Sequence, residues 1–415
     1  MDTKPRVLLV GHDDEPEPLD ATTDESLSDV LSRNRIPAAS IIATVDGEPV
    51  TDAVSLDPGT EYRVRLVEGY DLDSVRDLYD RPDDPGSAAV HTHRHVSFAS
   101  DGTVGIERTH LTLEELVTHV ESVVRETLEE YDLLAADSVL VGLSGEVDST
   151  ALLIALQRIA DERSDLTVAA ATVDDPWRRD ADPSVAVEYA TELAAELGVE
   201  LHTVSGTVAE RVYGIDGSFA DVFDRLSQTE YDEYAAAIGD HLITRLLEHV
   251  ATREGFETIA LGAHASDLVA GLLKSFASGF DVGAFPTRTF GELTYVYPAA
   301  LLSKRELALY HYGTRGEFVE HALSAEWTMQ SNEQTLYRYL ADQLLTYWPG
   351  IEYWLLEGNA RRTHDEPDGE AFASCANCGK TKQAQSLTST GPPVEGSCRV
   401  CEILESLGYL DHGTS

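Results

Sequence analysis

Apolar and polar positions change their spacing several times along the first 80 residues. One segment is almost entirely apolar, and in another apolar residues alternate with arginines; both patterns predict strands. A third segment repeats its apolar residues at helical spacing, which predicts a helix. A further segment contains the dipeptide Asp46-Gly47, which favours a tight turn between two strands. The expected elements are strands at 6–10 and 62–66, a helix at 24–34 and a hairpin at 40–50. The pattern predicts a small α+β domain over residues 1–80.

The order of these elements resembles a β-grasp, the fold of ubiquitin-like proteins. Residues 42–50, Ile-Ala-Thr-Val-Asp-Gly-Glu-Pro-Val, are similar to a segment of the sulfur-carrier members of that family. Those carriers end in Gly-Gly, whereas this chain continues through Glu68-Gly69-Tyr70. The resemblance therefore implies the fold without a C-terminal thiocarboxylate, and another small α+β domain is the alternative.

Residues 81–87 are rich in Pro, Asp and Gly, so we expect a linker over 81–110. His91, His93 and His95 fall within it. Alternate residues of a strand face the same side, so these side chains could bind a metal together. With no Cys or acidic residue close to them in the sequence, exposed polar positions are the simpler interpretation.

From residue 112 onward, apolar strands alternate with helices. A capping-box pattern at Thr112 to Glu115 opens a helix whose apolar stripe runs to Leu128. Such alternation predicts a doubly wound parallel α/β sheet, here over 111–360. Helical segments are expected from 262 to about 345. The expected strands are 138–143, 167–173, 200–204 and 258–261, with helices at 151–159, 185–197 and 238–250 between them.

Charge and composition narrow the class of protein. The 415 residues include 74 acidic and 30 basic side chains, a formal net charge of −44 that is spread along the whole chain. A uniform acidic excess is typical of proteins in molar salt, where the Debye length is about 3 Å, so we expect a halophilic protein. At such salt, purely electrostatic binding of nucleic acid is disfavoured. Without a long apolar run or a signal peptide pattern, we expect a cytoplasmic protein with no membrane partner.

One segment between the strand at 138–143 and the next helix carries candidate chemistry. It reads Leu143-Ser144-Gly145-Glu146-Val147-Asp148-Ser149-Thr150. A loop in this place directs main-chain N–H groups and a helix N-terminus at one point, which favours an anion. The segment resembles the PP-loop of ATP pyrophosphatases, Ser-Gly-Gly-x-Asp-Ser/Thr. The resemblance implies an adenine nucleotide alpha hydrolase-like fold, adenylation of a substrate oxygen by ATP, and pyrophosphate bound in this loop.

Glu146 stands where that pattern has its second glycine. A carboxylate about 5 Å from a phosphate would cost about 3 kcal/mol per charge pair at an effective dielectric of 20, and less in strong salt. A side chain here would cost a further ~1–2 kcal/mol if the backbone is left-handed. An outward-pointing side chain would leave binding intact, and an ordinary strand-to-helix turn is the alternative.

Further residues carry the same resemblance. Family members hold adenine and ribose after the second strand, and Gly262-Ala263-His264-Ala265-Ser266-Asp267 is similar to their Gly-His-Asn-x-Asp-Asp segment. Asp148 and Asp267 are implied as catalytic residues that orient Mg²⁺ and phosphates, and Lys274 either reaches a phosphate or lies in solvent. The implied nucleotide contacts are Leu143, Ser144, Gly145, Glu146, Asp148, Ser149, Thr172, Asp174, Gly262, Asp267 and Lys274.

All four cysteines of the chain lie in two CxxC pairs near the C-terminus. The pairs are Cys375 with Cys378 and Cys398 with Cys401, and 19 residues separate them. That spacing is typical of a structural four-cysteine zinc site, whereas disulfides are disfavoured in the cytoplasm. We expect a zinc ribbon over 361–415 that uses every thiol.

A PP-loop domain followed by such a ribbon resembles the TtuA-type tRNA 2-thiouridine synthases over residues 110–410. That family also has an N-terminal zinc finger and central catalytic cysteines, which are absent here, as at Gln228, Tyr231 and Ala322. The resemblance implies an ATP-dependent adenylating transferase of tRNA thiolation with ATP, Mg²⁺ and Zn²⁺. Because the thiols are missing, a non-catalytic partner subunit of an active thiolation enzyme is the second interpretation. Implied partners are ATP, tRNA, a ubiquitin-like sulfur carrier, an active paralogue, or a second copy in a homodimer.

Overall fold

The computed structural model divides into two compact units, and each is assembled from three separate stretches of chain. The first comprises Met1–Thr127, Ala263–Lys274 and Ala299–Gly358, and the second comprises Leu128–Gly262, Ser275–Pro298 and Asn359–Ser415. The sequence-based boundaries at residues 80, 110 and 360 stay predictions. The residues that the structure describes are 4–10, 16–34, 36–67, 88–98, 104–133, 138–163, 166–174, 183–229, 231, 235–278, 286–290, 292–319, 333–347, 350–364, 373–382 and 397–410.

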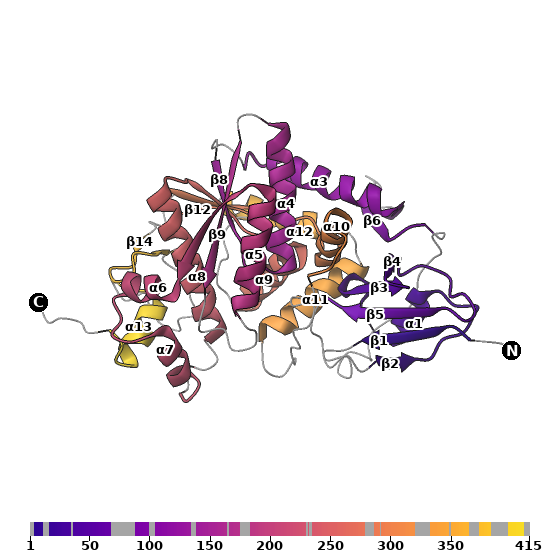
Figure 1. Ribbon diagram of the computed structural model, residues 1–415, viewed down its shortest axis with the longest axis horizontal. Helices are drawn as coiled ribbons and strands as arrows, with labels where there is room; N and C mark the ends of the chain where they lie inside the picture. The colour runs from indigo at the N-terminus through magenta and orange to yellow at the C-terminus, as the bar shows by residue number, and fades with distance from the viewer. Residues whose placement is uncertain are drawn as a thin grey trace, which may run out of the picture. The chain divides into compact units, whose positions relative to one another are not determined.

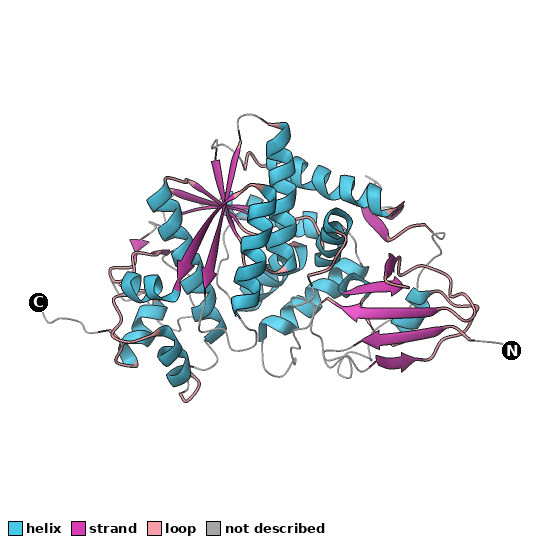
Figure 2. Ribbon diagram, in the orientation of Figure 1, coloured by secondary structure: helices cyan, strands magenta, loops and turns pink. Residues whose placement is uncertain are grey.

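The N-terminal part of the first unit is a five-stranded mixed sheet with a helix packed against it (Figures 1 and 2). Its strand order is β2-β1-β5-β3-β4, and only the β1–β5 pair is parallel. This arrangement agrees with the expected β-grasp-like fold. The elements are β1 (Arg6–Val10), β2 (Pro16–Leu19), α1 (Leu27–Arg33), the 3-10 helix η1 (Ala38–Ser40), β3 (Ile41–Val45), β4 (Glu48–Val50) and β5 (Glu61–Leu66).

Local chemistry accounts for this small sheet. Ser26 begins α1 with a capping box to Asp29. The β3–β4 hairpin turns at Asp46 and Gly47, whose φ values of 52° and 87° are those of a tight left-handed turn. The apolar face of α1 packs on the inward side chains of the strands in a core of their own.

The rest of the first unit is a hairpin and several helices. Strands β6 (His91–Phe98) and β7 (Val104–Leu111) pair antiparallel inside the range in which we expect a linker. The predicted capping box is confirmed, because the Thr112 N–H donates to Glu115 Oε2 over 2.9 Å. The helices are α3 (Leu113–Glu130), α9 (Ala265–Ser278), α10 (Lys304–Arg315), α11 (Glu333–Tyr347) and α12 (Ile351–His364), of which α3, α9 and α12 run past a unit boundary.

The second unit is built on a six-stranded sheet in the order β10-β9-β8-β11-β13-β12. The first five strands of that order are parallel, and β12 is antiparallel at the edge. Helices α4 and α5 cover one face and α8 covers the other (Figure 1), which confirms the predicted α/β fold. The elements are β8 (Ser138–Gly142), α4 (Val147–Glu162), β9 (Thr167–Asp174), α5 (Pro183–Leu197), β10 (Glu200–Ser205), α6 (Gly206–Tyr213), α7 (Phe219–Leu226), α8 (Ala235–Glu254), β11 (Thr258–Ala260), β12 (Thr287–Phe290), β13 (Leu293–Val296), β14 (Ala373–Ser374), β15 (Thr381–Lys382) and α13 (Arg399–Ser406).

The expectation of helix alone between 262 and 345 is wrong, because β12 and β13 lie within that range. Both strands are rich in threonine and aromatic residues, which favour strands. Strand β13 also pairs in parallel with β11, where Ile259 faces Tyr295. The strand propensity of these residues and the pairing of β13 with β11 therefore both favour strands in this segment.

The chain order creates a switch point between β8 and β11. After β8 the chain adds β9 and β10 on one side, and it later returns to add β11 and β13 on the other. In open α/β sheets, ligands bind outside the carboxyl ends of the strands at such a point. The loop at 143–146 and residues 261–262 after β11 are therefore where this fold favours a ligand. Among the described residues no helix is long and apolar enough to cross a membrane.

Candidate functional site

Two serines fix the loop that follows β8. The Ser144 N–H donates to Ser149 Oγ over 3.1 Å, and the two hydroxyl oxygens are 3.0 Å apart. The Glu146 N–H in turn donates to Ser144 Oγ over 3.3 Å, and Ser149 Oγ–H donates to the Glu146 carbonyl over 3.2 Å. These bonds close the loop onto the first turn of α4.

The start of α4 has the properties of an anion site. Its N-cap residue is Glu146, and in the part of the chain that the structure describes no side chain caps this helix. A helix N-terminus presents N–H groups and the positive end of the helix dipole, so an uncapped one favours a phosphate.

Two glycines allow the main chain to approach closely here. Gly145 has φ +79°, and a Cβ at this position would collide with the carbonyl oxygen of Ala186. A Cβ at Gly262 would lie 2.8 Å from the Ser149 nitrogen. The segment after β11 therefore lies against the first turn of α4, as a shared ligand site at the switch point requires.

Glu146 itself does not occupy a strained position. Its φ of −83° and ψ of 164° are extended values that any residue adopts. The backbone cost expected from the sequence pattern therefore does not apply at this position. Glu146 as a residue is half-buried, and the charge of its side chain is the remaining departure from the pattern.

The other predicted contacts of the second unit share the same sheet edge. The Leu143 N–H donates to the Ala171 carbonyl over 2.8 Å, which places the start of the loop beside β9. Thr172 is buried in β9, and Asp174 is exposed at its carboxyl end. Asp148 is half-buried in the first turn of α4. Nine predicted contacts belong to this edge: Leu143, Ser144, Gly145, Glu146, Asp148, Ser149, Thr172, Asp174 and Gly262.

Asp267 and Lys274 belong to the first unit, on helix α9. Arg338 Nη2 lies 2.8 Å from Asp267 Oδ1, and His264 Nε2 lies 3.3 Å from its Oδ2. Burial alone would raise the pKa of Asp267, but the positive charges of Arg338, His264 and Lys304 outweigh it and hold the pKa well below its usual value. Asp267 is therefore ionised at any physiological pH, and Lys274 is half-buried two turns further along.

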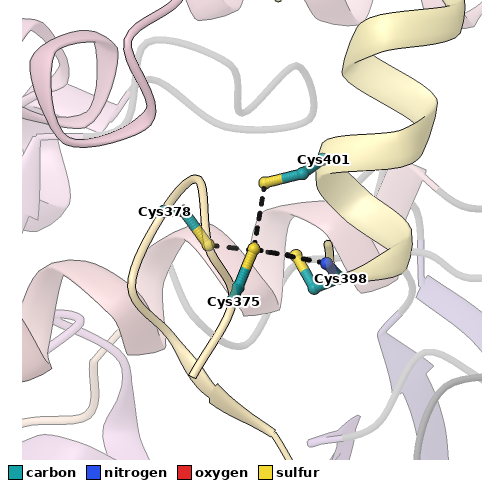
Figure 3. A group of neighbouring side chains, drawn as sticks. All are labelled: Cys375, Cys378, Cys398 and Cys401. Atoms are coloured by element: carbon teal, nitrogen blue, oxygen red, sulfur yellow. Dashed lines mark hydrogen bonds between the residues drawn. The ribbon is translucent and has the colours of Figure 1, made fainter. Parts of the chain in front are cut away.

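The four cysteines come together as predicted (Figure 3). All four are buried, and their sulfurs are 3.7 Å apart for Cys375 with Cys401 and 3.9 Å for Cys378 with Cys398. A disulfide needs about 2.05 Å. Four thiolates at about 2.3 Å from one tetrahedral ion stand about 3.8 Å apart. The geometry fits a single metal ion, as in a zinc ribbon.

Helix α8 supports the cysteine cluster with residues that sequence reasoning missed. His241 Nε2 lies 3.6 Å from Cys398 Sγ, and Arg245 donates to the Cys378 carbonyl over 2.6 Å. Glu248 accepts from Lys380 over 3.0 Å. These three α8 residues are spaced by four and three, which puts them on one helix face. The sequence shows that these three polar residues share one helix face, but only the structure shows that this face contacts the cysteine cluster.

Residues 116–332 match the family model of the PP-loop domain. The chain belongs to the PP-loop family. A comparison of this PP-loop protein with curated protein sequences finds no match. The family assignment agrees with the uncapped N-terminus of α4 and with the switch point, both of which favour an anionic ligand at this edge of the sheet.

A comparison with solved structures finds proteins of similar fold. The U34-tRNA thiolase NcsA from Methanococcus maripaludis, with its [4Fe-4S] cluster, is similar with a TM-score of 0.54 and 16% identity, over 73% of this chain and 92% of that one. At this identity the likeness shows the fold alone. NAD⁺ synthetase from Burkholderia pseudomallei matches with a TM-score of 0.36 and 16% identity over 62% of this chain and 90% of its own.

The residues of this PP-loop protein do not fit an iron–sulfur cluster in addition to the ribbon. Every cysteine of the chain is one of the four that meet in Figure 3. A four-iron cluster would bind each thiolate to a different iron and so hold the sulfurs further apart.

Proposed function

We propose that this PP-loop protein binds ATP with Mg²⁺ at the carboxyl edge of the second unit's sheet and adenylates a substrate in a tRNA thiolation-like modification. The observation that carries the proposal is the loop from Gly145 to Ser149, which leads into the uncapped N-terminus of α4. Such a helix end favours the triphosphate of ATP, while Thr172 and Asp174 offer polar groups for the adenosine end.

In the proposed reaction a substrate oxygen attacks the α-phosphorus, the bond to the bridging oxygen of the β-phosphate breaks, and pyrophosphate leaves into the loop. The helix dipole and the hydroxyls of Ser144 and Ser149 would stabilise the charge that develops on the leaving group. Carboxylate oxygens suit Mg²⁺, and Asp148 is the candidate ligand within this edge. Asp267 stays a predicted ligand, and its low pKa keeps it in the charged form that binds Mg²⁺.

A second candidate function rests on the cysteine inventory. Sulfur transfer through a persulfide needs a cysteine thiolate, and all four thiols are grouped in one cluster that we assign to a structural Zn²⁺. The chain would then supply activation only, or act as a non-catalytic subunit beside an active thiolation enzyme. The charge of Glu146 at the anion site also supports this second candidate.

ATP–pyrophosphate exchange in molar KCl, with and without bulk tRNA, tests the first candidate. The wild type is compared with Asp148→Ala and with Asp161→Ala, an exposed position on the same helix. We expect exchange that depends on tRNA, that Asp148→Ala abolishes and that Asp161→Ala retains. ATP binding without exchange would favour the subunit, and equal ATP binding by the wild type and Asp148→Ala would refute the site.

The role of sulfur is tested by reconstitution of the chain alone with ATP, unmodified tRNA and sulfide, followed by mass spectrometry of the tRNA. Because no thiol lies outside the cluster, we expect no 2-thiouridine. Formation of 2-thiouridine by the chain alone would show that adenylation suffices, and it would exclude the need for a second subunit.

A further inference from the structure

Three histidines and one glutamate meet inside the first unit. Strand β6 supplies His91 and His93 from one face, α3 supplies His119, and α10 supplies Glu306. The side chains of His91 and Glu306 are only 10% and 7% exposed. The expectation of exposed polar positions is therefore wrong for His91, because its acidic partner comes from a distant part of the sequence. The side chain of His95 lies outside the described residues.

A single carboxylate oxygen faces all three rings. Glu306 Oε1 is 3.1 Å from His91 Nε2, and it is 3.6 Å from both His93 Nδ1 and His119 Nε2. Only the first of these distances is within hydrogen-bonding range. Ligand atoms at about 2.0–2.1 Å from a tetrahedral Zn²⁺ stand about 3.3 Å apart, which lies between the observed values. The spacing suits one shared cation better than three separate hydrogen bonds.

Hydrogen bonds hold the Glu306 carboxylate in place. The Ser303 N–H and hydroxyl both donate to Glu306 Oε2 over 2.8 Å, as the capping box of α10. That contact fixes the carboxylate and leaves Oε1 facing the rings, as outer hydrogen bonds do for metal ligands. His119 Nε2 is buried and has no hydrogen-bond partner among the described residues, although it faces the same oxygen.

The charges of the neighbourhood favour a cation. The guanidinium of Arg305 lies 3.2 Å from Asp52 and donates to the Val90 carbonyl over 3.2 Å, so its charge is matched by Asp52. The carboxylate of Glu306 is buried and faces the three imidazole rings and, among the described residues, no guanidinium. A buried carboxylate is stabilised by a bound cation.

We propose that His91, His93 and Glu306, whose ligand atoms all lie within 4.8 Å of one another, bind Zn²⁺ or a similar divalent transition ion, and that His119, 3.6 Å from the same carboxylate, completes the site. Imidazole nitrogens with one carboxylate are typical ligands of zinc, whereas Mg²⁺ and Ca²⁺ prefer oxygen throughout. The ion joins β6, α3 and α10 and is separate from the ion of the cysteine cluster. The proposal does not depend on the nucleotide site.

Zinc stoichiometry of the full chain tests this site. The protein is stripped with a chelator, equilibrated by dialysis against Zn²⁺ in high salt, and analysed for bound metal. We expect two zinc ions per chain in the wild type and one in Glu306→Gln. Glutamine preserves the capping box of α10, so that the variant should stay folded. His119→Gln is a second variant, and His110→Gln, an exposed histidine on β7, is the matched control that should keep two ions.

Cobalt distinguishes the two sites. Thiolate-bound Co²⁺ has an intense sulfur-to-metal charge-transfer absorption, which a histidine–carboxylate site lacks. We expect a Cys378→Ser, Cys401→Ser double variant to lose that absorption and still bind one Co²⁺ with weak visible bands. One zinc ion per chain in the wild type would overturn the proposal and identify the cluster as a metal-free ion pair. Two zinc ions in a folded Glu306→Gln would overturn it as well, because the second ion would then bind without the Glu306 carboxylate.

Discussion

At the scale of single residues, the backbone conformation of Glu146 and the charge of its side chain have different consequences. Its extended backbone is compatible with the loop, so no strain opposes a side chain at this position. A carboxylate beside the proposed phosphate site is nevertheless unfavourable. The consequence of this residue for nucleotide binding is therefore purely electrostatic.

Replacing Glu146 with glutamine removes the charge and keeps the shape. We expect ATP to bind about 3- to 10-fold more tightly in 1 M KCl, because the unscreened repulsion of about 3 kcal/mol at 5 Å is reduced by salt. Calorimetry with a non-hydrolysable ATP analogue measures the change, and Glu162→Gln at the far end of α4 is the control. Equal affinities would show that the carboxylate points away from the phosphates.

His311 is a buried titratable group with a clear consequence for stability. It is fully buried in α10, and its Nδ1–H donates to the Glu317 carbonyl over 2.9 Å. Burial lowers the pKa of His311 to about 4, and the carbonyl partner offsets only part of that effect. In the unfolded chain the same group takes up a proton near pH 6.5.

Between pH 6.5 and 4 the unfolded state therefore binds more protons at His311 than the folded state does. The free energy of unfolding should fall as the pH is lowered through this window, with His311 accounting for about 2 kcal/mol of the loss at pH 5. His311→Asn can keep the donor to the carbonyl but cannot titrate, so it should lose less stability between pH 7.5 and 5. Denaturant unfolding at both pH values measures this, and identical losses in the two proteins would contradict it.

At the scale of elements, the turn from β8 into α4 depends on Gly145. Gly145→Ala places a Cβ against the carbonyl of Ala186 and forces the loop to move, so ATP affinity should fall by more than about tenfold. Gly198→Ala is a matched control, since Gly198 has φ +68° but a Cβ added there would meet nothing within 4 Å. Both variants lose stability from backbone strain, but only the first should lose nucleotide binding in calorimetry.

Elements that a local sequence pattern specifies were predictable from the sequence. Contacts between residues that are distant in the sequence were not. The strand, loop and helix at Ser138 to Glu162 have a clear signal, because the apolar strand, the glycine and the helical spacing agree. The cysteine pairs likewise carry their own spacing. The contacts of Glu306 with His91, and of Arg305 with Asp52, join residues more than 200 positions apart, so no local pattern contains them.

At the scale of the whole molecule, the net charge of −44 makes stability depend on the salt concentration. The Debye length is about 10 Å at 0.1 M salt and about 3 Å at 1 M, so self-repulsion acts across the surface only in dilute salt. We expect the midpoint of thermal unfolding to rise by several degrees between 0.1 M and 2 M KCl. Sucrose at equal osmolality is the control because it does not screen charge. A midpoint that is independent of KCl would refute the prediction of a halophilic protein.

The division into two discontinuous units determines how this chain can be dissected. The polypeptide changes unit after Thr127, Gly262, Lys274, Pro298 and Gly358. A gene fragment that starts at Met1 and ends anywhere between the first and last of these positions encodes neither unit in full. Loss of activity in such a truncation would report a failure to fold and would not locate a function. Substitutions of single residues, in a chain of full length, are therefore the means by which the nucleotide site, the cysteine cluster and the histidine site can be assigned their separate roles.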